Sequence, residues 1–261
     1  MFRDYNSATN NIKINYKNAR IFQTVEFVKY MNNKYNNFTI DISITEALNA
    51  LNKFIDLSDP DTKLPNLEHL YQSAQAALDN NEPEWIIIIC LIHDLGKIIY
   101  LKGDSLDGTS INNQYSIVGD TFIVGCKIPD SIVYPEYNIL NTDMHNDKYN
   151  SKYGIYKSNC GLEKCLISYG HDEYLYQLLK FNNINLSEEA LYIIRYHSLY
   201  LHHKENAYKH LLNDKDIKLL PLLKKFNTYD LYSKNPKKIS EENKEYFNNL
   251  LHKYFPNNIY Y

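Results

Sequence analysis

Apolar side chains recur every three or four positions along most of the chain, the spacing that places them on one face of a helix. Ile44, Leu48, Leu51 and Ile55 show it clearly. The pattern predicts helices over residues 21–32, 43–57, 66–80, 85–101, 161–180, 187–201, 208–212, 218–232 and 240–254. Asn66 is expected to cap the helix that it begins. The sequence therefore predicts a mainly helical, all-α fold.

Two stretches depart from this pattern. Residues 116–133 alternate and carry β-branched side chains between Gly119, Gly125 and Pro129, which predicts a short β-hairpin. Residues 1–15 are polar and are expected to form an extended arm. No repeat, low-complexity tract or Gly/Ser-rich linker divides the chain. We therefore expect one domain over residues 1–261, with residues 1–15 as an N-terminal arm or lid.

The composition limits the kinds of partner. With 44% hydrophobic and 23% charged residues, the chain is typical of globular proteins. Its formal net charge of −3 offers no basic face for nucleic acid or an anionic membrane. The four cysteines form no Cys-x-x-Cys pair and are expected to be reduced thiols. The N-terminus lacks a signal-peptide pattern, and the most apolar run, residues 85–92, is too short to span a bilayer. We expect a cytoplasmic monomer with no nucleic-acid or membrane partner.

The sharpest chemical signal is the run from Ile86 to Lys97, in which His93 and Asp94 follow an apolar stretch. A carboxylate buried there carries a large desolvation cost unless a positive charge compensates it. Because the two residues are adjacent, His93 can bind one metal ion while Asp94 reaches a second. The ammonium of Lys97, one helical turn later, can hold or deprotonate a substrate hydroxyl, and Gly96 permits close approach. The alternative is a buried His–Asp hydrogen bond, with Lys97 directed outward.

Further His and Asp residues fall on apolar helix faces far apart in the sequence. His197 continues the face of Ile193 and Ile194, and Asp230 is expected to turn toward the core in the same way. Singly, each has a structural alternative, such as a satisfied core histidine at 197 or a helix cap at His171. Together, the side chains expected to face inward and bind metal are His69, His93, Asp94, His171, His197 and Asp230. This imidazole and carboxylate set suits iron, manganese or zinc, and spacing does not choose among them.

These residues lie in blocks that resemble the myo-inositol oxygenase family, several of them specific to that family within the wider HD-domain group. The resemblance runs in order along nearly the whole chain, from the N-terminal Phe-Arg-Asp-Tyr to Lys234. The blocks are Asn-Leu-Glu-His ending at His69, His-Asp-Leu-Gly-Lys from His93, Val-Gly-Asp-Thr-Phe from Val118, Tyr-Gly-His-Asp-Glu-Tyr from Tyr169, Ile-Arg-Tyr-His-Ser from Ile194, and Phe-Asn-Thr-Tyr-Asp-Leu-Tyr-Ser-Lys from Phe226.

The resemblance implies an HD-domain-like helical bundle that holds two non-haem iron ions. The six inward residues would then be the iron ligands, with Asp94 bridging the two ions. It also implies a ring-opening oxidation of myo-inositol by O2 to D-glucuronate, a step of inositol catabolism, with Lys97 and Asp94 as catalytic residues. The implied substrate contacts are Arg3, Asp56, Leu57, Ser58, Lys97, Gly119, Asp120, His197, Ser198 and Lys234. Among them, Arg3 would close the site from the N-terminal arm.

Two other classes of protein share part of this pattern. An HD-type metal-dependent phosphohydrolase has the same His, His-Asp and Asp skeleton. It would need cations for phosphate beyond Lys97 and Lys234, yet of the three arginines only Arg3 and Arg195 flank the motifs. A non-catalytic metal-binding protein of this type would be expected to lose ligands or the lysines, and none is missing. The oxygenase interpretation is therefore preferred.

Overall fold

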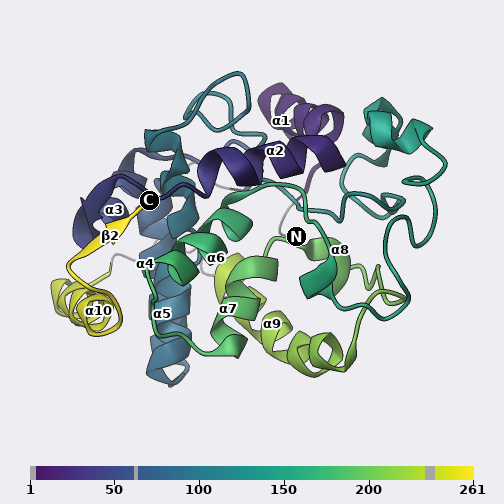
Figure 1. Cartoon of the computed structure of the whole chain (residues 1–261). Helices are drawn as coiled ribbons and strands as arrows, with labels where there is room; N and C mark the ends of the chain where they lie inside the picture. Colours follow the sequence, from purple (N-terminus) through teal and green to yellow (C-terminus); the bar gives the residue numbers. More distant parts are fainter. Residues whose placement is uncertain (1–3, 62–63, 233–238) are drawn as a thin grey trace.

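The computed structural model describes residues 4–61, 64–232 and 239–261, and the predicted all-α class is confirmed (Figure 1). The α-helices are α1 (Asn10–Phe22), α2 (Val25–Tyr35), α3 (Ile44–Ala50), α4 (Asn66–Asp79), α5 (Glu84–Ile92), α6 (His171–Phe181), α7 (Glu188–Tyr196), α8 (Tyr200–His203), α9 (Asp214–Tyr232) and α10 (Glu241–Tyr254). Short 3-10 helices are η1 (Leu51–Lys53), η2 (Leu95–Leu101), η3 (Pro135–Leu140), η4 (Thr142–His145) and η5 (Leu162–Lys164). Among these described residues, no helix combines the length and apolarity that crossing a bilayer requires.

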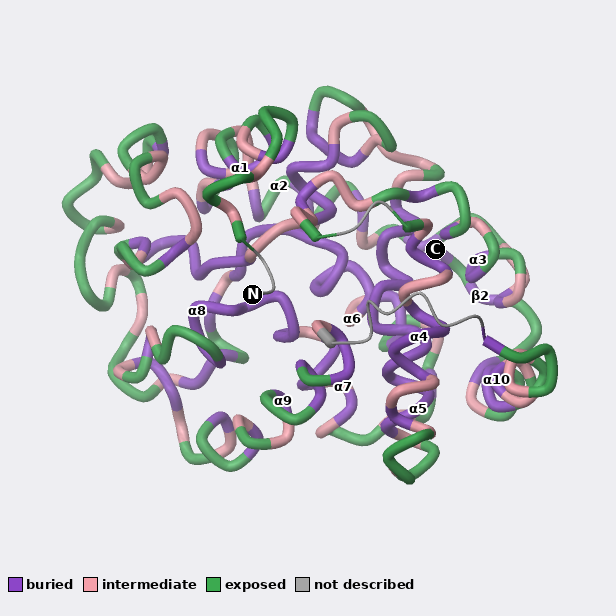
Figure 2. The backbone as a smooth tube through the Cα atoms, turned by 180° about the vertical axis from the view of Figure 1, so that it is seen from behind, coloured by how far each residue is buried: buried purple, intermediate pink, exposed green. Residues whose placement is uncertain are grey.

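The core is built around α5. Every residue from Ile86 to Ile92 is buried, which is typical of a helix with apolar side chains on all sides. Helices α4, α7, α9 and α10 all contact it. Figure 2 shows the buried backbone running through this centre, with exposed segments on the outer turns. Ligands carried by α4, α7 and α9 can therefore meet at one end of α5.

The predicted helix over residues 85–101 is wrong in its middle. Helix α5 ends at Ile92, and the chain leaves α-helical geometry at Asp94 before it continues as the 3-10 helix η2. Close packing accounts for the break, because a Cβ atom at Gly96 would lie 2.1 Å from the carbonyl oxygen of His171, at the start of α6. This confirms the expected close approach at Gly96. It also places His93 and Asp94 at a helix end, where their side chains can point in different directions.

The hairpin predicted for residues 116–133 does not form. A two-stranded antiparallel pair occurs elsewhere, between β1 (Asp41–Ser43) and β2 (Asn258–Tyr260), with Ile42 opposite Ile259. Within 116–133 there is one isolated bridge, from Ile123 to Ile167. Most β-branched residues of this segment are buried in the same apolar cluster as residues of the helices, so burial explains the sequence pattern without a sheet.

The N-terminal segment is also more helical than expected. Helix α1 begins at Asn10, so residues 10–15 of the predicted extended arm are its first turns. Ile12 and Tyr16 are buried along one side of this helix, which explains why a largely polar sequence forms it. Residues 4–9 precede the helix, and the Tyr5 hydroxyl lies 2.8 Å from that of Tyr16.

Candidate metal centre

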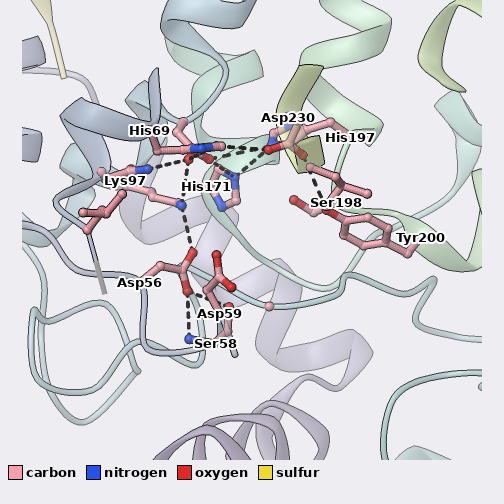
Figure 3. A pocket seen from close by; sticks show the side chains of 15 residues that line it. Asp56, Ser58, Asp59, His69, Lys97, His171, His197, Ser198, Tyr200 and Asp230 are labelled. Carbon is pink, nitrogen blue, oxygen red and sulfur yellow. Dashed lines mark hydrogen bonds and ion pairs between the residues drawn. The ribbon is translucent and has the colours of Figure 1, made fainter. Parts of the chain in front are cut away.

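The structure brings all six predicted metal ligands together from five segments. His69 comes from α4, His93 and Asp94 from the break after α5, His171 from the first turn of α6, His197 from the end of α7, and Asp230 from the last turns of α9. All are buried except His69, which is half-buried. Figure 3 shows several of these side chains pointing toward one another at one wall of a pocket.

His69, His93 and Asp230 form what we call the outer cluster. The Nε2 atoms of His69 and His93 lie 3.0 and 3.5 Å from Oδ1 of Asp230, and 3.9 and 3.6 Å from Oδ2 of Asp94. Nδ1 of His93 donates to the Cys90 carbonyl at 3.0 Å, which leaves the lone pair of a neutral ring on Nε2. Within the described residues, this buried Nε2 has no hydrogen-bond partner. A lone pair facing two carboxylates is unfavourable unless a proton or a metal cation lies between them.

His171, His197 and Asp172 form what we call the inner cluster. Nδ1 of His171 donates to the Ile117 carbonyl at 2.6 Å, and Nδ1 of His197 donates to the Ile194 carbonyl at 2.8 Å. The two Nε2 atoms therefore face each other, 3.1 Å apart. Oδ1 of Asp94 lies 3.0 Å from Nε2 of His171 and 3.8 Å from Nε2 of His197. Asp94 thus presents one oxygen to each cluster.

The charges in this array are strongly coupled. Burial opposes ionisation of Asp94, but the charges of Lys97 and His93 outweigh it and hold its pKa well below the ordinary value. Burial also opposes ionisation of Asp230, whose pKa is held well below the ordinary value by His69 and His93. Burial disfavours the imidazolium of His171, yet Asp172 and Asp94 raise its pKa to about 10. Cations would replace these protons, because imidazole and carboxylate oxygen are common ligands of transition metals.

Beside the two clusters, a second part of the site is organised around Lys97. Its Nζ donates to Oδ2 of Asp94 and to Oδ2 of Asp56, both at 2.9 Å, and Asp56 in turn accepts from the backbone and hydroxyl of Ser58 (Figure 3). Burial would lower the pKa of Lys97, but the two carboxylates outweigh it and raise the pKa. Lys97 is therefore a charged donor in this setting. The cavity beside it has a volume of about 80 Å³, enough for several water molecules or for polar groups of a small ligand.

Most of the predicted substrate contacts line this cavity. They are Asp56, Ser58, Lys97, Gly119, His197 and Ser198. Leu57 and Asp120 do not line it: the backbone N–H of Leu57 donates to Gln114, and Asp120 accepts a hydrogen bond from the Tyr16 hydroxyl at 3.0 Å. Arg3 and Lys234 lie outside the described residues.

Four further polar residues of the site were not predicted from the sequence. Asn66 donates to Oδ2 of Asp94 at 2.7 Å, and Asp59 and Tyr200 line the cavity. The capping role expected of Asn66 is wrong, because Pro65 occupies the N-cap position and Asn66 is the first helical residue. Asp172 was also missed, although the sequence carried a signal: His171 and Asp172 repeat the His-Asp dipeptide of the first site.

Comparison with known proteins agrees with the earlier resemblance. A family model described as myo-inositol oxygenase matches residues 9–261. The chain is 44% identical to inositol oxygenase 1 of Arabidopsis thaliana, over 99% of this chain and 83% of that protein. It is 38% identical to the inositol oxygenase of Dictyostelium discoideum, over 100% of this chain and 89% of that protein, and 37% identical to that of Mus musculus, over 99% and 90%. Similarity of this extent, over a chain that gathers the predicted ligands in one place, shows that the protein belongs to the myo-inositol oxygenase family.

Proposed function

We propose that this protein is an inositol oxygenase that opens the ring of myo-inositol with O2 to give D-glucuronate. The reaction balances as C6H12O6 + O2 → C6H10O7 + H2O, so no further reductant is needed. Family membership supports this activity. The structural observation that carries the proposal is Asp94, whose two carboxylate oxygens face two separate His and Asp clusters beside a polar cavity.

The residues fit a pair of iron ions. The outer cluster with Oδ2 of Asp94 would hold one ion, and the imidazoles of the inner cluster with Oδ1 of Asp94 would hold the other. The unpartnered Nε2 of His93 and the facing Nε2 atoms of His171 and His197 support this assignment, because each is aimed at a space bounded by carboxylates. Bound iron would supply the redox chemistry with O2 and the Lewis acidity that favours ionisation of a coordinated hydroxyl.

The protein's own groups would bind and orient the polyol. Lys97 is charged and held between two carboxylates, which favours its role as a donor that holds a substrate hydroxyl over its role as a base. Asp56, Ser58 and Ser198 supply acceptors and donors around the same cavity, as a ring with a hydroxyl on every carbon requires. We retain Arg3, Leu57, Gly119, Asp120 and Lys234 as proposed substrate contacts on the strength of the family resemblance.

Three further properties belong to the proposal. We propose a cytoplasmic protein that acts as a monomer, with residues 1–261 as one domain. Its unpaired cysteines support the location. Size-exclusion chromatography with light scattering tests the monomer, and a mass near 30.8 kDa is expected.

One assay separates the proposed activity from its rivals. Purified protein is supplied with Fe(II), O2 and myo-inositol, and O2 uptake and glucuronate are measured together. Equal amounts of O2 consumed and glucuronate formed are expected. Release of phosphate from nucleotides or phosphoesters without O2 uptake would favour an HD-type phosphohydrolase. Iron binding with neither reaction would favour a non-catalytic protein.

A further inference from the structure

Two cysteines lie side by side at the short 3-10 helix η5, outside the candidate metal centre. Cys160 lies two residues before this helix, and Cys165 directly follows it. Their Sγ atoms are 3.9 Å apart, and each thiol donates to the same acceptor, the Gly161 carbonyl, at 3.6 Å. Neither cysteine lines the cavity beside Lys97. The pair is therefore a cluster of nucleophilic side chains that the proposed oxygenase reaction does not use.

The turn that carries the two thiols is fixed by its surroundings. Gly161 has a φ of +85°, and a Cβ atom there would lie 2.2 Å from Nδ2 of Asn213, so this position requires glycine. The N–H of Gly161 donates to the Leu211 carbonyl at 2.7 Å. The N–H of Leu162 donates to Oδ2 of the buried Asp216 at 3.0 Å. The proximity of the two sulfurs thus follows from the packing of η5 against the segment that leads into α9.

The sulfurs are close enough to be joined after a small movement. A disulfide bond is about 2.05 Å long, so the two Sγ atoms would have to approach each other by about 1.9 Å. Rotation of the half-buried Cys160 side chain supplies a movement of this size without displacing the backbone of the turn. The reduced pair is therefore preorganised for disulfide formation.

The two thiols differ in their access to solvent. Cys160 is half-buried, whereas Cys165 is 2% exposed. Burial raises the pKa of the Cys165 thiol, and a negative charge on the neighbouring Cys160 would raise it further. Cys165 therefore stays protonated, and Cys160 is the thiol that a small oxidant in solvent meets first.

We propose that Cys160 and Cys165 form a redox modification site whose substrate is hydrogen peroxide. The Cys160 sulfur attacks one peroxide oxygen, the O–O bond breaks, and a sulfenic acid and one water are formed. The Cys165 sulfur then attacks the sulfenic sulfur, so that an S–S bond replaces the S–O bond and the hydroxyl leaves with the Cys165 proton as a second water. Two thiols and one H2O2 thus give one disulfide and two waters, and a dithiol reductant reverses the change.

The role of Cys165 is to trap the sulfenic acid on Cys160. Without a second thiol, another peroxide converts a sulfenic acid to a sulfinic acid, which dithiols do not reduce. With Cys165 in contact, the oxidation stops at a disulfide that can be reduced. This inference does not depend on the proposed oxygenase function, because neither thiol belongs to the metal centre.

Peptide mapping after peroxide treatment tests the site. The iron-loaded full chain, freed of unbound metal, is treated with H2O2, quenched with catalase, alkylated in denaturant and digested with trypsin. Cleavage after Lys157, Lys164 and Lys180 places the two cysteines on separate peptides, so the disulfide should join residues 158–164 to 165–180. The joined pair should weigh about 2 Da less than the two reduced peptides together, and dithiothreitol should separate it.

Three variants decide how the pair reacts. Cys165→Ser should form no disulfide, and its Cys160 peptide should gain about 32 Da that dithiothreitol does not remove. Cys160→Ser should leave the Cys165 peptide unoxidised. Cys126→Ser, which changes another buried thiol, should form the same disulfide as the wild type. A wild type that joins Cys160 to Cys126, or that accumulates sulfinic acid at Cys160 beside a free Cys165, would overturn the inference. The wild-type map alone decides if a variant does not fold.

Discussion

The outer and inner clusters use the same kinds of side chain in different surroundings. In the outer cluster, the side chains of His69 and Asp230 are 13% and 11% exposed, whereas none in the inner cluster exceeds 5%. Asp94 shows the same asymmetry. Its Oδ2, on the outer side, accepts from Lys97 and Asn66, but its Oδ1 meets imidazoles on the inner side. Two of the three outer side chains are thus more accessible to solvent than any inner one, although His93 is only 1% exposed. Among the described residues, ammonium and amide donors act on the outer oxygen of Asp94 and not on the inner one.

The largest effect is expected at the one residue that both clusters share. Asp94→Asn removes the bridging charge, so it should lose most bound iron and lower kcat/KM by about 10³-fold or more. Asp107→Asn is the control, because it changes another buried carboxylate, which accepts from Lys34 and Tyr35 away from the site. Iron content and glucuronate formation are measured for both variants. An Asp94→Asn protein with two irons would show that the clusters do not depend on a common bridge.

Lys97→Met should impair substrate binding and turnover without impairing metal binding. The variant keeps the length of the side chain but removes the ammonium between Asp56 and Asp94, so iron should stay bound while turnover falls by about 10²-fold. Lys34→Met is the matched control, since Lys34 also pairs with a buried carboxylate, that of Asp107. Single-turnover glucuronate yield and iron content are the measurements. Full activity of Lys97→Met would refute its role in holding substrate.

The ligands could be predicted because helical spacing determines which side chains face inward. His197 and Asp230 each continue an apolar face, so their burial followed from the sequence, and the structure confirms it. Asp172 was missed because it follows His171 at the start of α6, where an acidic residue has an ordinary explanation in the helix dipole. The contact of Asn66 with Asp94 was missed because it depends on how α4 packs against the end of α5, which spacing along one helix does not specify.

The errors in the fold have a similar origin. The end of helix α5 at Ile92 depends on contact between Gly96 and α6. That helix lies some seventy-five residues further along the sequence. Residues 116–133 have the composition of strands, but most of their apolar side chains are buried in one cluster with residues of helices from distant parts of the sequence. Local propensity describes such residues correctly as buried and β-branched, yet it does not say what buries them. Helix positions were therefore predicted better than breaks and connections.

Removal of iron should reveal the difference in solvent accessibility between the two clusters. A chelator should release iron in two phases, and the faster one should come from the outer cluster, in which the side chains of His69 and Asp230 are more exposed than any in the inner cluster. Loss of an ion present at about 100 times its dissociation constant should cost about 2.7 kcal/mol of stability, or a fall in Tm of roughly 5–10 °C per ion. Release kinetics of Asp230→Asn check the assignment, because only the slow phase should remain. If only the fast phase remains in Asp230→Asn, the inner cluster would be the one that releases iron faster.

Asn66→Ala should give the smallest effect and the most selective one. Within the part of the chain that the structure describes, the Asn66 amide donates to the outer oxygen of Asp94 alone. Its loss should therefore lower the iron affinity of the outer cluster about tenfold and leave that of the inner cluster unchanged. At saturating iron, kcat should stay within about twofold, because Lys97 still holds the same oxygen. Asn227→Ala is a suitable control: that side chain is also buried, but its amide donates to the Leu223 carbonyl within α9. If Asn66→Ala lowers the iron affinity of both clusters equally, Asp94 transmits the change to both. The two carboxylate oxygens would then not act separately.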